Sequence, residues 1–324
     1  MGLLDWLKTI FSGGYEPRKR TDAGPAGLGK PAGRAGKANR PAGALSLMDL
    51  SNRVGLPASD MQAVPVAYDE FTIPKRRGGK RKILAPQPQL KALQRRILRR
   101  VLGRLRAHPA AMGFEHGRSI VTHARLHARA AVVVRMDVQD FFPSTAAARV
   151  REYFEVIGWS AEPAELLVKW CTHNGQLPQG AATSPRLSNL VNYAIDARLA
   201  ALAKKLGATY SRYADDITFS FAEDSRAAIA AAIQVTKRVV ADYGYKLHLK
   251  RKLSIRRHHQ RQAVTGLVVN DGVRLPRETR RRLRAIRHRL AAGRDATLTA
   301  DQLAGWAALE NMIAKQAAEQ TGVG

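Results

Sequence analysis

The chain has 324 residues, of which 45% are hydrophobic and 25% are charged, values typical of a globular protein that buries a core. No apolar run approaches the roughly 20 residues of a membrane-spanning helix, and a single cysteine excludes a disulfide scaffold or a cysteine-rich zinc module. Lys and Arg number 54 against 26 Asp and Glu, which gives a formal net charge of +28. Such a charge favours a polyanionic partner, nucleic acid first and an anionic membrane surface second.

The first 44 residues differ in composition from the rest. Residues 1–11 carry apolar side chains at helical spacing, which predicts a short amphipathic helix. Residues 12–44 are rich in Gly, Ala, Pro, Lys and Arg and have almost no large apolar side chains. Because such a segment cannot bury enough surface to offset its ordering entropy, we expect a disordered basic arm. The compact region is expected to begin near Leu45 with a small helical segment.

Four segments predict β structure in the compact region. Two short basic strands are expected on either side of a Gly-Gly turn at 78–79, and a β-branched run over 131–138 predicts a buried strand. Alternating side chains over 210–221 predict a hairpin. A second hairpin is expected over 264–275, with its turn at the Asn-Asp-Gly of 270–272.

Helical spacing and capping residues predict the remaining elements. Helices are expected over 89–106, 147–157, 162–172, 225–243 and 277–292. Another helix is predicted to begin with Ser184 as its cap and Pro185 in its first turn, and to end before Gly207. Thr299 and Gln302 fit a capping box for a last helix. Because helices and hairpins alternate without a regular βαβ repeat, the chain is expected to adopt an α+β fold.

Acidic residues are scarce in this chain, so their positions are informative. Asp137 ends the predicted buried strand, and Asp215 and Asp216 are adjacent at a predicted hairpin tip. An Asp-Asp pair alone is ordinary turn chemistry. Converging carboxylates repel one another, however, and a divalent cation between them relieves that repulsion. The β-forming flanks and the upstream Asp137 therefore favour a metal site, of the kind in which two ions stabilise the attacking and leaving oxygens of a phosphoryl displacement.

Three segments carry a resemblance to a known family. RMDVQDFFPS, LPQGAATSPRLSNL and SRYADDITFS resemble, in order and spacing, motifs A, B and C of reverse transcriptases. The resemblance covers the chain from about Leu45 to Ala314 and implies a right-hand polymerase, with fingers over 45–130, palm over 131–262 and thumb over 263–324 behind the arm of residues 1–44. It implies RNA-directed DNA polymerase activity with deoxynucleoside triphosphates (dNTPs) as substrates and two Mg²⁺ ions as cofactor.

The resemblance also implies roles for individual residues. Asp137, Asp215 and Asp216 match the catalytic carboxylates that bind the metal ions. Phe142 matches the bulky aromatic residue that excludes a ribose 2′-OH. Gln179, followed by Gly180, matches the motif B turn beside the template and the incoming nucleotide.

Basic residues on both sides of these motifs match further positions of the family. Arg81 matches the fingers arginine that grips the incoming triphosphate, with Lys75 as a neighbour, and a guanidinium suits bidentate phosphate contact. Past motif C, the family commonly has an Asn followed by a Lys that acts on the leaving pyrophosphate. Here His248 replaces the Asn, and the Lys position aligns best with Arg251, which leaves open whether Arg251 or a neighbouring Lys serves.

Two shorter elements resemble those of bacterial retron reverse transcriptases. The first resembles their VTG signature and consists of Val264, Thr265 and Gly266. The second resembles their NAxxH element, with Ala124 and His127 matching and His123 standing where Asn is usual. The retron resemblance implies a structured noncoding RNA of the msr-msd type as template and primer. Synthesis would start from the 2′-OH of a guanosine and give a branched RNA–DNA hybrid.

The expected partners are this RNA and its cDNA, dNTPs, and a separate effector protein in antiphage defence, with no membrane span. The RNA-binding set is expected to be Val264, Thr265, Gly266, Arg280, Arg284 and Arg287. The lone Cys171 lies in an apolar helix, which predicts a structural thiol in the reducing cytoplasm. Two alternatives stay open: another bacterial reverse transcriptase, intron-like or defence-associated, and a non-catalytic RNA-binding protein with a polymerase fold.

Overall fold

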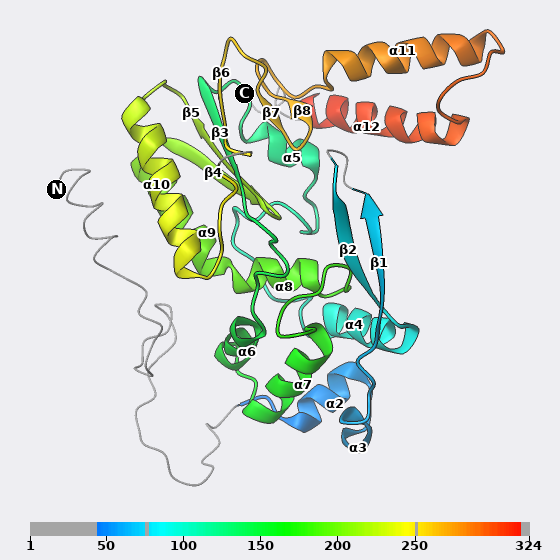
Figure 1. Ribbon diagram of the computed structural model, residues 1–324, viewed down its shortest axis with the longest axis vertical. Coiled ribbons are helices and arrows are strands. Elements are labelled where there is room, and N and C mark those ends of the chain that lie inside the picture. Colours follow the sequence, from blue (N-terminus) through cyan, green and yellow to red (C-terminus); the bar gives the residue numbers. More distant parts are fainter. Residues whose placement is uncertain (1–43, 75–77, 250–251, 319–324) are drawn as a thin grey trace. The chain divides into compact units, whose positions relative to one another are not determined.

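The computed structural model describes residues 44–74, 78–249 and 252–318, and these belong to two compact units (Figure 1). The first unit comprises Met1–Arg106, Phe142–Val191 and Arg238–Tyr245. The second comprises Ala107–Phe141, Asn192–Lys237 and Lys246–Gly324. Neither unit is continuous in sequence. The predicted helix and arm of the first 43 residues lie outside the described residues.

The first unit is mostly helical. Its elements are α2 (Leu47–Val54), α3 (Ala58–Met61), β1 (Tyr68–Pro74), β2 (Lys80–Pro86), α4 (Pro88–Arg100), α6 (Ala147–Val156), α7 (Ala161–Cys171) and α8 (Ser184–Val191). The largest of its fully buried side chains are Trp170 and Phe154. The buried Gln94 of α4 joins separate segments, because its Nε2 donates to the Trp170 carbonyl (2.9 Å) and its Oε1 accepts from the Ala182 amide (3.1 Å). Cys171 is also buried, which raises the pKa of its thiol to about 12.

The predicted basic hairpin of this unit is confirmed as β1 and β2, which pair antiparallel from Tyr68 opposite Pro86 to Pro74 opposite Lys80. Helix α4 ends at Arg100, earlier than the predicted residue 106. The amides of Val101 and Leu102 both donate to the Ile97 carbonyl, so the regular ladder of helical hydrogen bonds stops there.

The second unit contains a four-stranded antiparallel sheet and several helices. Its elements are α5 (Ile120–Arg125), β3 (Val132–Asp137), α9 (Tyr193–Lys205), β4 (Ala208–Tyr213), β5 (Asp216–Phe221), α10 (Arg226–Asp242, whose last turn belongs to the first unit), β6 (Ser254–Arg257), β7 (Ala263–Val264), β8 (Leu267–Val268), α11 (Arg277–Ala291) and α12 (Ala300–Ala318). The strand order is β4-β5-β3-β6. The central strand β3 is almost wholly buried, as its β-branched run predicts.

Two predicted elements need correction. The helix predicted from Ser184 to Gly207 is two helices, α8 and α9, that part at Asn192. The Arg149 guanidinium donates to the Val191 carbonyl (3.2 Å), which diverts an acceptor from the helical ladder at that point. Gly207 does follow the last turn, with a φ of +61°.

The hairpin predicted over 264–275 folds back twice. Its tight turn lies at Thr265-Gly266, between β7 and β8, with φ values of +45° and +84°. The predicted Asn-Asp-Gly turn lies in a wider loop that brings Val268 opposite Arg274. A two-residue turn with both φ values positive matches the twist of the flanking strands, which explains why the chain folds back already at residue 265.

A separate apolar cluster holds α5, the β7–β8 hairpin, α11 and α12 together within the second unit. Its buried members include Val121, Val264, Leu267, Leu283 and Ile313. The predicted capping box at the start of α12 is confirmed, since the Thr299 amide donates to Gln302 Oε1 (3.1 Å) and the Gln302 amide to Thr299 Oγ1 (3.2 Å).

The two units together combine helices with antiparallel sheet, so the α+β prediction is confirmed. No helix within the described ranges is long and apolar enough to cross a bilayer.

Candidate active site

The three carboxylates predicted from the sequence lie together at one end of the β3–β5 pair, within the second unit. The strand register places Asp137 directly opposite Asp216. The Val138 amide donates to the Asp215 carbonyl (2.9 Å), which fixes the turn against the end of β3. The structure therefore brings Asp137, Asp215 and Asp216 to one edge of the sheet.

The turn that carries Asp215 is tight and strained. Tyr213 and Asp216 are paired, so Ala214 and Asp215 alone form the turn, and Ala214 has a φ of +55°. A non-glycine residue held in this region carries a cost of about 1–3 kcal/mol that the surrounding structure must offset. Gly113 packs against this turn: a Cβ added there would lie 3.0 Å from the Ala214 nitrogen and 3.2 Å from the Tyr213 ring. No sequence pattern had singled out Gly113.

The carboxyl group of Asp215 is electrostatically perturbed. Burial is the main cause and the neighbouring Asp137 and Asp216 charges add to it, so the pKa of Asp215 rises to about 6. Asp137 and Asp216 are thus close enough to disfavour a further negative charge at the turn. A cation near these carboxylates would relieve that repulsion.

Three basic side chains lie beside the carboxylates. Lys252 Nζ lies 2.6 Å from Asp137 Oδ1, and the imidazole of His248 lies 3.9 Å from the same oxygen. The Arg135 guanidinium donates to both oxygens of Asp216, each at 3.0 Å. The sequence alignment favoured Arg251, which lies outside the described residues. Among the neighbouring lysines, which the sequence left open as alternatives, Lys252 lies at the carboxylates.

The described carboxylate, imidazole and thiol groups include no three that converge as ready ligands for one metal ion. Lys252 and Arg135 pair with two of the three carboxylates. The donor set nonetheless fits a hard divalent cation. Mg²⁺ takes one or two carboxylates together with substrate phosphates, and the mutual repulsion at Asp215 is the condition that such an ion relieves.

A buried polar network supports the hairpin from behind. The Nε2 atoms of His123 and His127, at 2.7 and 2.6 Å, both contact the Ser211 hydroxyl of β4, and His127 Nδ1 contacts the Ser220 hydroxyl of β5 at 2.8 Å. A hydroxyl has one proton, so Ser211 donates to one imidazole and accepts from the other. Burial lowers the pKa of His123 to about 4 and that of His127 to about 3, which keeps both rings neutral. The two histidines of the NAxxH-like element therefore join the α5 region to the β4–β5 hairpin that carries Asp215 and Asp216.

The site residues predicted for the nucleotide lie in the first unit. Gln179 and Gly180 dock on β2, where the Leu84 amide donates to the Gln179 carbonyl (2.8 Å). A Cβ added at Gly180 would lie 2.6 Å from the Leu84 carbonyl oxygen, and the φ of Gly180 is +128°. Arg81 is exposed on the same strand. The motif B turn and the fingers arginine are thus brought to one strand.

Phe142 and Lys75 complete that predicted set. Phe142 is half-buried, and its carbonyl accepts from the Thr145 amide (3.0 Å). Lys75 lies outside the described residues. The neighbouring Lys82 pairs with Glu70 across the hairpin at 2.6 Å.

The VTG segment is a β-turn, and only part of it reaches the surface. Val264 is fully buried in the apolar cluster of the second unit, so its side chain contributes packing and cannot contact RNA. Thr265 Oγ1 donates to the Ile120 carbonyl at the start of α5 (3.1 Å), and Gly266 is exposed. The signature thus joins the hairpin to the helix that carries His123.

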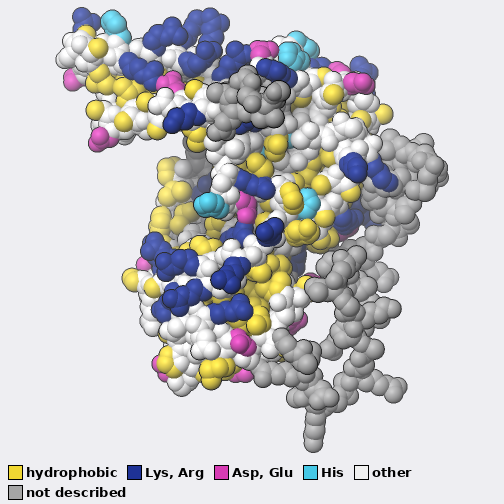
Figure 2. Space-filling model, turned by 180° about the vertical axis from the view of Figure 1, so that it is seen from behind, with side chains coloured by type: hydrophobic (Ala, Val, Ile, Leu, Met, Phe, Trp, Pro, Cys, Tyr) yellow, Lys and Arg dark blue, Asp and Glu magenta, His cyan; other side chains and the backbone are white. Residues whose placement is uncertain are grey.

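Figure 2 shows Lys and Arg side chains crowded over α11. Arg280 and Arg284 are exposed on this helix, whereas Arg287 pairs with Glu310 of α12. One of the three arginines predicted to bind RNA therefore already has a carboxylate partner.

Carboxylates at a hairpin tip, with a lysine and an arginine beside them, suit phosphate chemistry with a divalent cation. Comparison with known proteins is consistent with that chemistry. Residues 73–266 match the reverse transcriptase (RNA-dependent DNA polymerase) family, and the chain belongs to it. The three motifs lie within the matched range. Enzymes of this family generally use divalent metal ions.

Several curated relatives are retron enzymes. The retron Mx162 and Mx65 reverse transcriptases of Myxococcus xanthus are 39% identical over 279 residues and 38% identical over 271 residues, covering 76% and 78% of this chain. The retron Ec86 reverse transcriptase of Escherichia coli is 33% identical over 242 residues, which cover 74% of each chain. The alignments span 57% and 63% of the two Myxococcus proteins. These matches confirm the resemblance to bacterial retron-type reverse transcriptases.

Proposed function

We propose that this protein is an RNA-directed DNA polymerase that extends a primer hydroxyl with dNTPs on an RNA template. The observation that carries the proposal is the meeting of Asp137, Asp215 and Asp216 at one sheet edge, in a chain whose matched family is the reverse transcriptases. The sequence order of fingers (45–130), palm (131–262) and thumb (263–324) is part of the same proposal.

The three carboxylates would hold two Mg²⁺ ions, which when bound stabilise the attacking and leaving oxygens of the transfer. Of the candidates that the sequence left open, Arg251 or a neighbouring Lys, Lys252 is proposed to act on the leaving pyrophosphate. Its ammonium lies at Asp137, where it can donate a proton or a hydrogen bond to the leaving pyrophosphate. Arg135 orients the carboxylate of Asp216 through two hydrogen bonds.

The residues of the first unit would bind the incoming nucleotide. Arg81 is suited to the triphosphate and Phe142 to excluding a ribose 2′-OH. Gln179 and Gly180 would lie beside the base pair, in a turn that can pack on the Leu84 carbonyl of β2 because Gly180 has no Cβ.

The retron relatives support a finer proposal. The template and primer would be a structured noncoding RNA of the msr-msd type, with synthesis starting from the 2′-OH of a guanosine and giving a branched hybrid with the cDNA. The exposed arginines Arg280 and Arg284, together with the surface of Thr265 and Gly266, would contact this RNA. We place the protein in the cytoplasm, with a separate effector protein in antiphage defence.

The test is DNA synthesis by purified protein with Mg²⁺, dNTPs and either an RNA template with annealed DNA primer or the RNA that co-purifies with the protein. The variant D215N removes a metal-binding carboxylate, and we expect it to abolish synthesis while RNA binding stays near wild type. The matched control D224N makes the same chemical change at a surface ion pair with Arg257 and should keep activity. Substantial synthesis by D215N would overturn the site assignment.

The product separates the alternatives. A branched product on co-purified RNA supports the retron proposal, and an ordinary primer-extended product alone supports another bacterial reverse transcriptase. Absence of any product from the wild-type protein would indicate a non-catalytic RNA-binding protein with a polymerase fold.

A further inference from the structure

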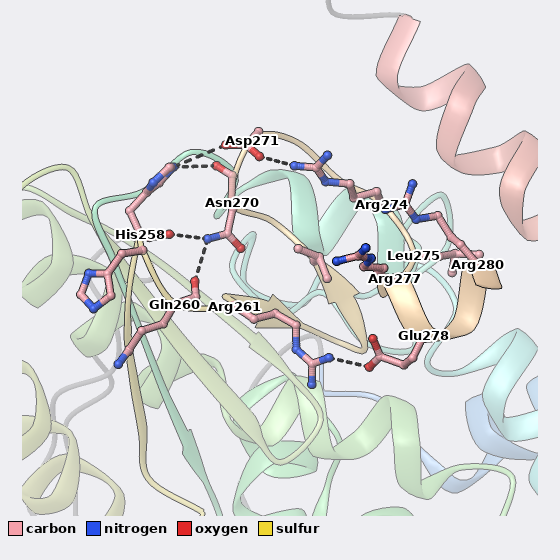
Figure 3. Close-up of a pocket in the computed structure, with 12 residues that line it drawn as sticks. His258, Gln260, Arg261, Asn270, Asp271, Arg274, Leu275, Arg277, Glu278 and Arg280 are labelled. Carbon is pink, nitrogen blue, oxygen red and sulfur yellow. Dashed lines mark hydrogen bonds and ion pairs between the residues drawn. The ribbon is translucent and has the colours of Figure 1, made fainter. Parts of the chain in front are cut away.

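A second candidate site lies in the second unit, in the loops that precede α11. A cavity of about 440 Å³ is lined by residues of the loops 258–261 and 268–275 and of the first turn of α11, 277–280 (Figure 3). We name it the α11 pocket. Its volume is in the range of sites for small organic groups, which is about 300–1,000 Å³. None of the residues assigned to catalysis lines it.

Asn270 holds the walls of this pocket in place. Its Nδ2 donates to the carbonyls of His258 (2.6 Å) and Gln260 (2.7 Å), and its Oδ1 accepts from the Gln262 amide (3.0 Å). Gln262 is fully buried and in turn donates to the carbonyl of Ala130 (3.0 Å). The two loops are therefore joined before any ligand arrives, and a preformed site loses less entropy on binding.

The charge of the pocket favours an anion. Four arginines and two carboxylates line it, and both carboxylates are already paired: Glu278 with Arg261 (2.5 Å) and Asp271 with Arg274. Within the described part of the chain, Arg277 and Arg280 have no carboxylate within ion-pair distance. Figure 3 shows Arg277 lying between the Arg261–Glu278 pair and Arg274, with Arg280 beside it. Two guanidinium groups are thus available for a phosphate.

The rest of the lining suits a flat ring. Leu275 is buried at 5% exposed, so the apolar surface of the lining comes from the half-buried Val268. His258 and Arg261 add an imidazole and a guanidinium, whose faces stack on bases splayed out of RNA. A phosphate contact beside a stacking surface is the chemistry of one nucleotide.

The ligand is expected to be a polymer, because the basic surface continues beyond the pocket. Arg277, Arg280 and Arg284 lie at i, i+3 and i+7 and so share one face of α11. At 1.5 Å per residue they extend about 10 Å along the helix, which provides contacts to more than one phosphate.

We propose that the α11 pocket receives one unpaired nucleotide of the RNA partner, with its base against Val268 and the His258 ring and its phosphate on Arg277 and Arg280. The inference rests on the proposed function for the identity of the polymer as RNA. It adds that this surface distinguishes an RNA bulge or loop from a continuous RNA duplex.

The test compares two short fluorescent RNA hairpins that differ by a single bulged nucleotide. We expect wild-type protein to bind the bulged hairpin about tenfold or more tightly, since stacking of one base contributes an effect of that order. The variant R277Q/R280Q should lose this preference. The matched control R282Q/R289Q removes the same charge from α11 outside the pocket, and it should weaken binding to both hairpins equally while keeping the preference.

Two outcomes would overturn the proposed nucleotide binding in the α11 pocket. One is equal binding of the two hairpins by wild-type protein, and the other is an equal loss of preference in both double variants. DNA synthesis by wild-type protein on an annealed DNA primer and RNA template tests the proposed function separately. If wild-type protein shows no synthesis but prefers the bulged hairpin, the proposed polymerase activity is refuted and the proposed role of the α11 pocket is not. Circular dichroism of each variant checks that it is folded.

Discussion

The buried pair His123 and His127 predicts that this protein loses stability as the pH falls below neutral. Burial holds the pKa of His123 at about 4 and that of His127 at about 3, whereas an imidazole in an unfolded chain has a pKa of about 6.5. Between these values the unfolded chain binds protons that the folded chain does not. The free energy of unfolding therefore falls with falling pH, and above about pH 6.5 this contribution is fully present.

The size of the effect follows from the same pKa values. At pH 5 the solution is about 1.5 pH units below the unfolded pKa, and each unit is equivalent to about 1.4 kcal/mol. Each buried histidine then lowers the free energy of unfolding by about 2 kcal/mol, and the pair by about 4 kcal/mol. This is a large share of a typical total of about 5–15 kcal/mol.

The variant H127Q removes one of the two titrating groups. It also loses hydrogen bonds to Ser211 and Ser220, so its stability is expected to be lower even at pH 8. The informative quantity is the slope of unfolding free energy against pH between about pH 6 and 5. We expect that slope to fall by about 1.4 kcal/mol per pH unit relative to wild type.

Urea unfolding followed by circular dichroism over this pH range measures the slope. The control H288Q changes a histidine that is exposed on α11, and it should leave the slope as in wild type. Equal slopes for H127Q and wild type would show that His127 is not held neutral by burial.

Three further predictions concern synthesis. G180A should lower activity about tenfold or more, because its Cβ would lie 2.6 Å from the Leu84 carbonyl oxygen and such overlap costs about 1–3 kcal/mol. The control is G175A, since Gly175 also has a positive φ but has open space around it. Equal activities of the two variants would contradict the close approach of Gly180 to Leu84. F142A should admit ribonucleotides in a competition assay, and unchanged sugar discrimination would remove its role. K252A should lower kcat about 10²-fold or more, and by more than R251A does. A larger effect of R251A in single-turnover kinetics would indicate that Arg251, and not Lys252, acts on the leaving pyrophosphate.

Local pattern was enough to predict most elements. Turn glycines, capping residues and the spacing of apolar side chains act over a few residues, and the hairpin β1–β2, the strand β3 and the capping box at Thr299 formed where these signals lie. The resemblance of three motifs was enough to indicate the family that residues 73–266 match. The three aspartates could be singled out because acidic residues are rare in this chain.

Other features depend on residues that are distant in sequence. Lys252 and Asp137 are 115 positions apart, and their contact exists only because the chain around 246–248 returns to the end of β3. The break at Asn192 depends on Arg149, from a different helix. No local pattern carries such pairings, since each is decided by which hydrogen-bond donor the folded chain brings to an acceptor.

The sequence by itself determined the family of the protein and the α+β composition, and it singled out the three aspartates that the structure brings to one sheet edge. Only the tertiary structure decided which base faces Asp137, that Val264 is a core residue, and that the loops held by Asn270 enclose a pocket with two available arginines. The reason is physical: composition, spacing and capping act along the chain, whereas burial, charge pairing and cavities arise when separate segments pack against each other.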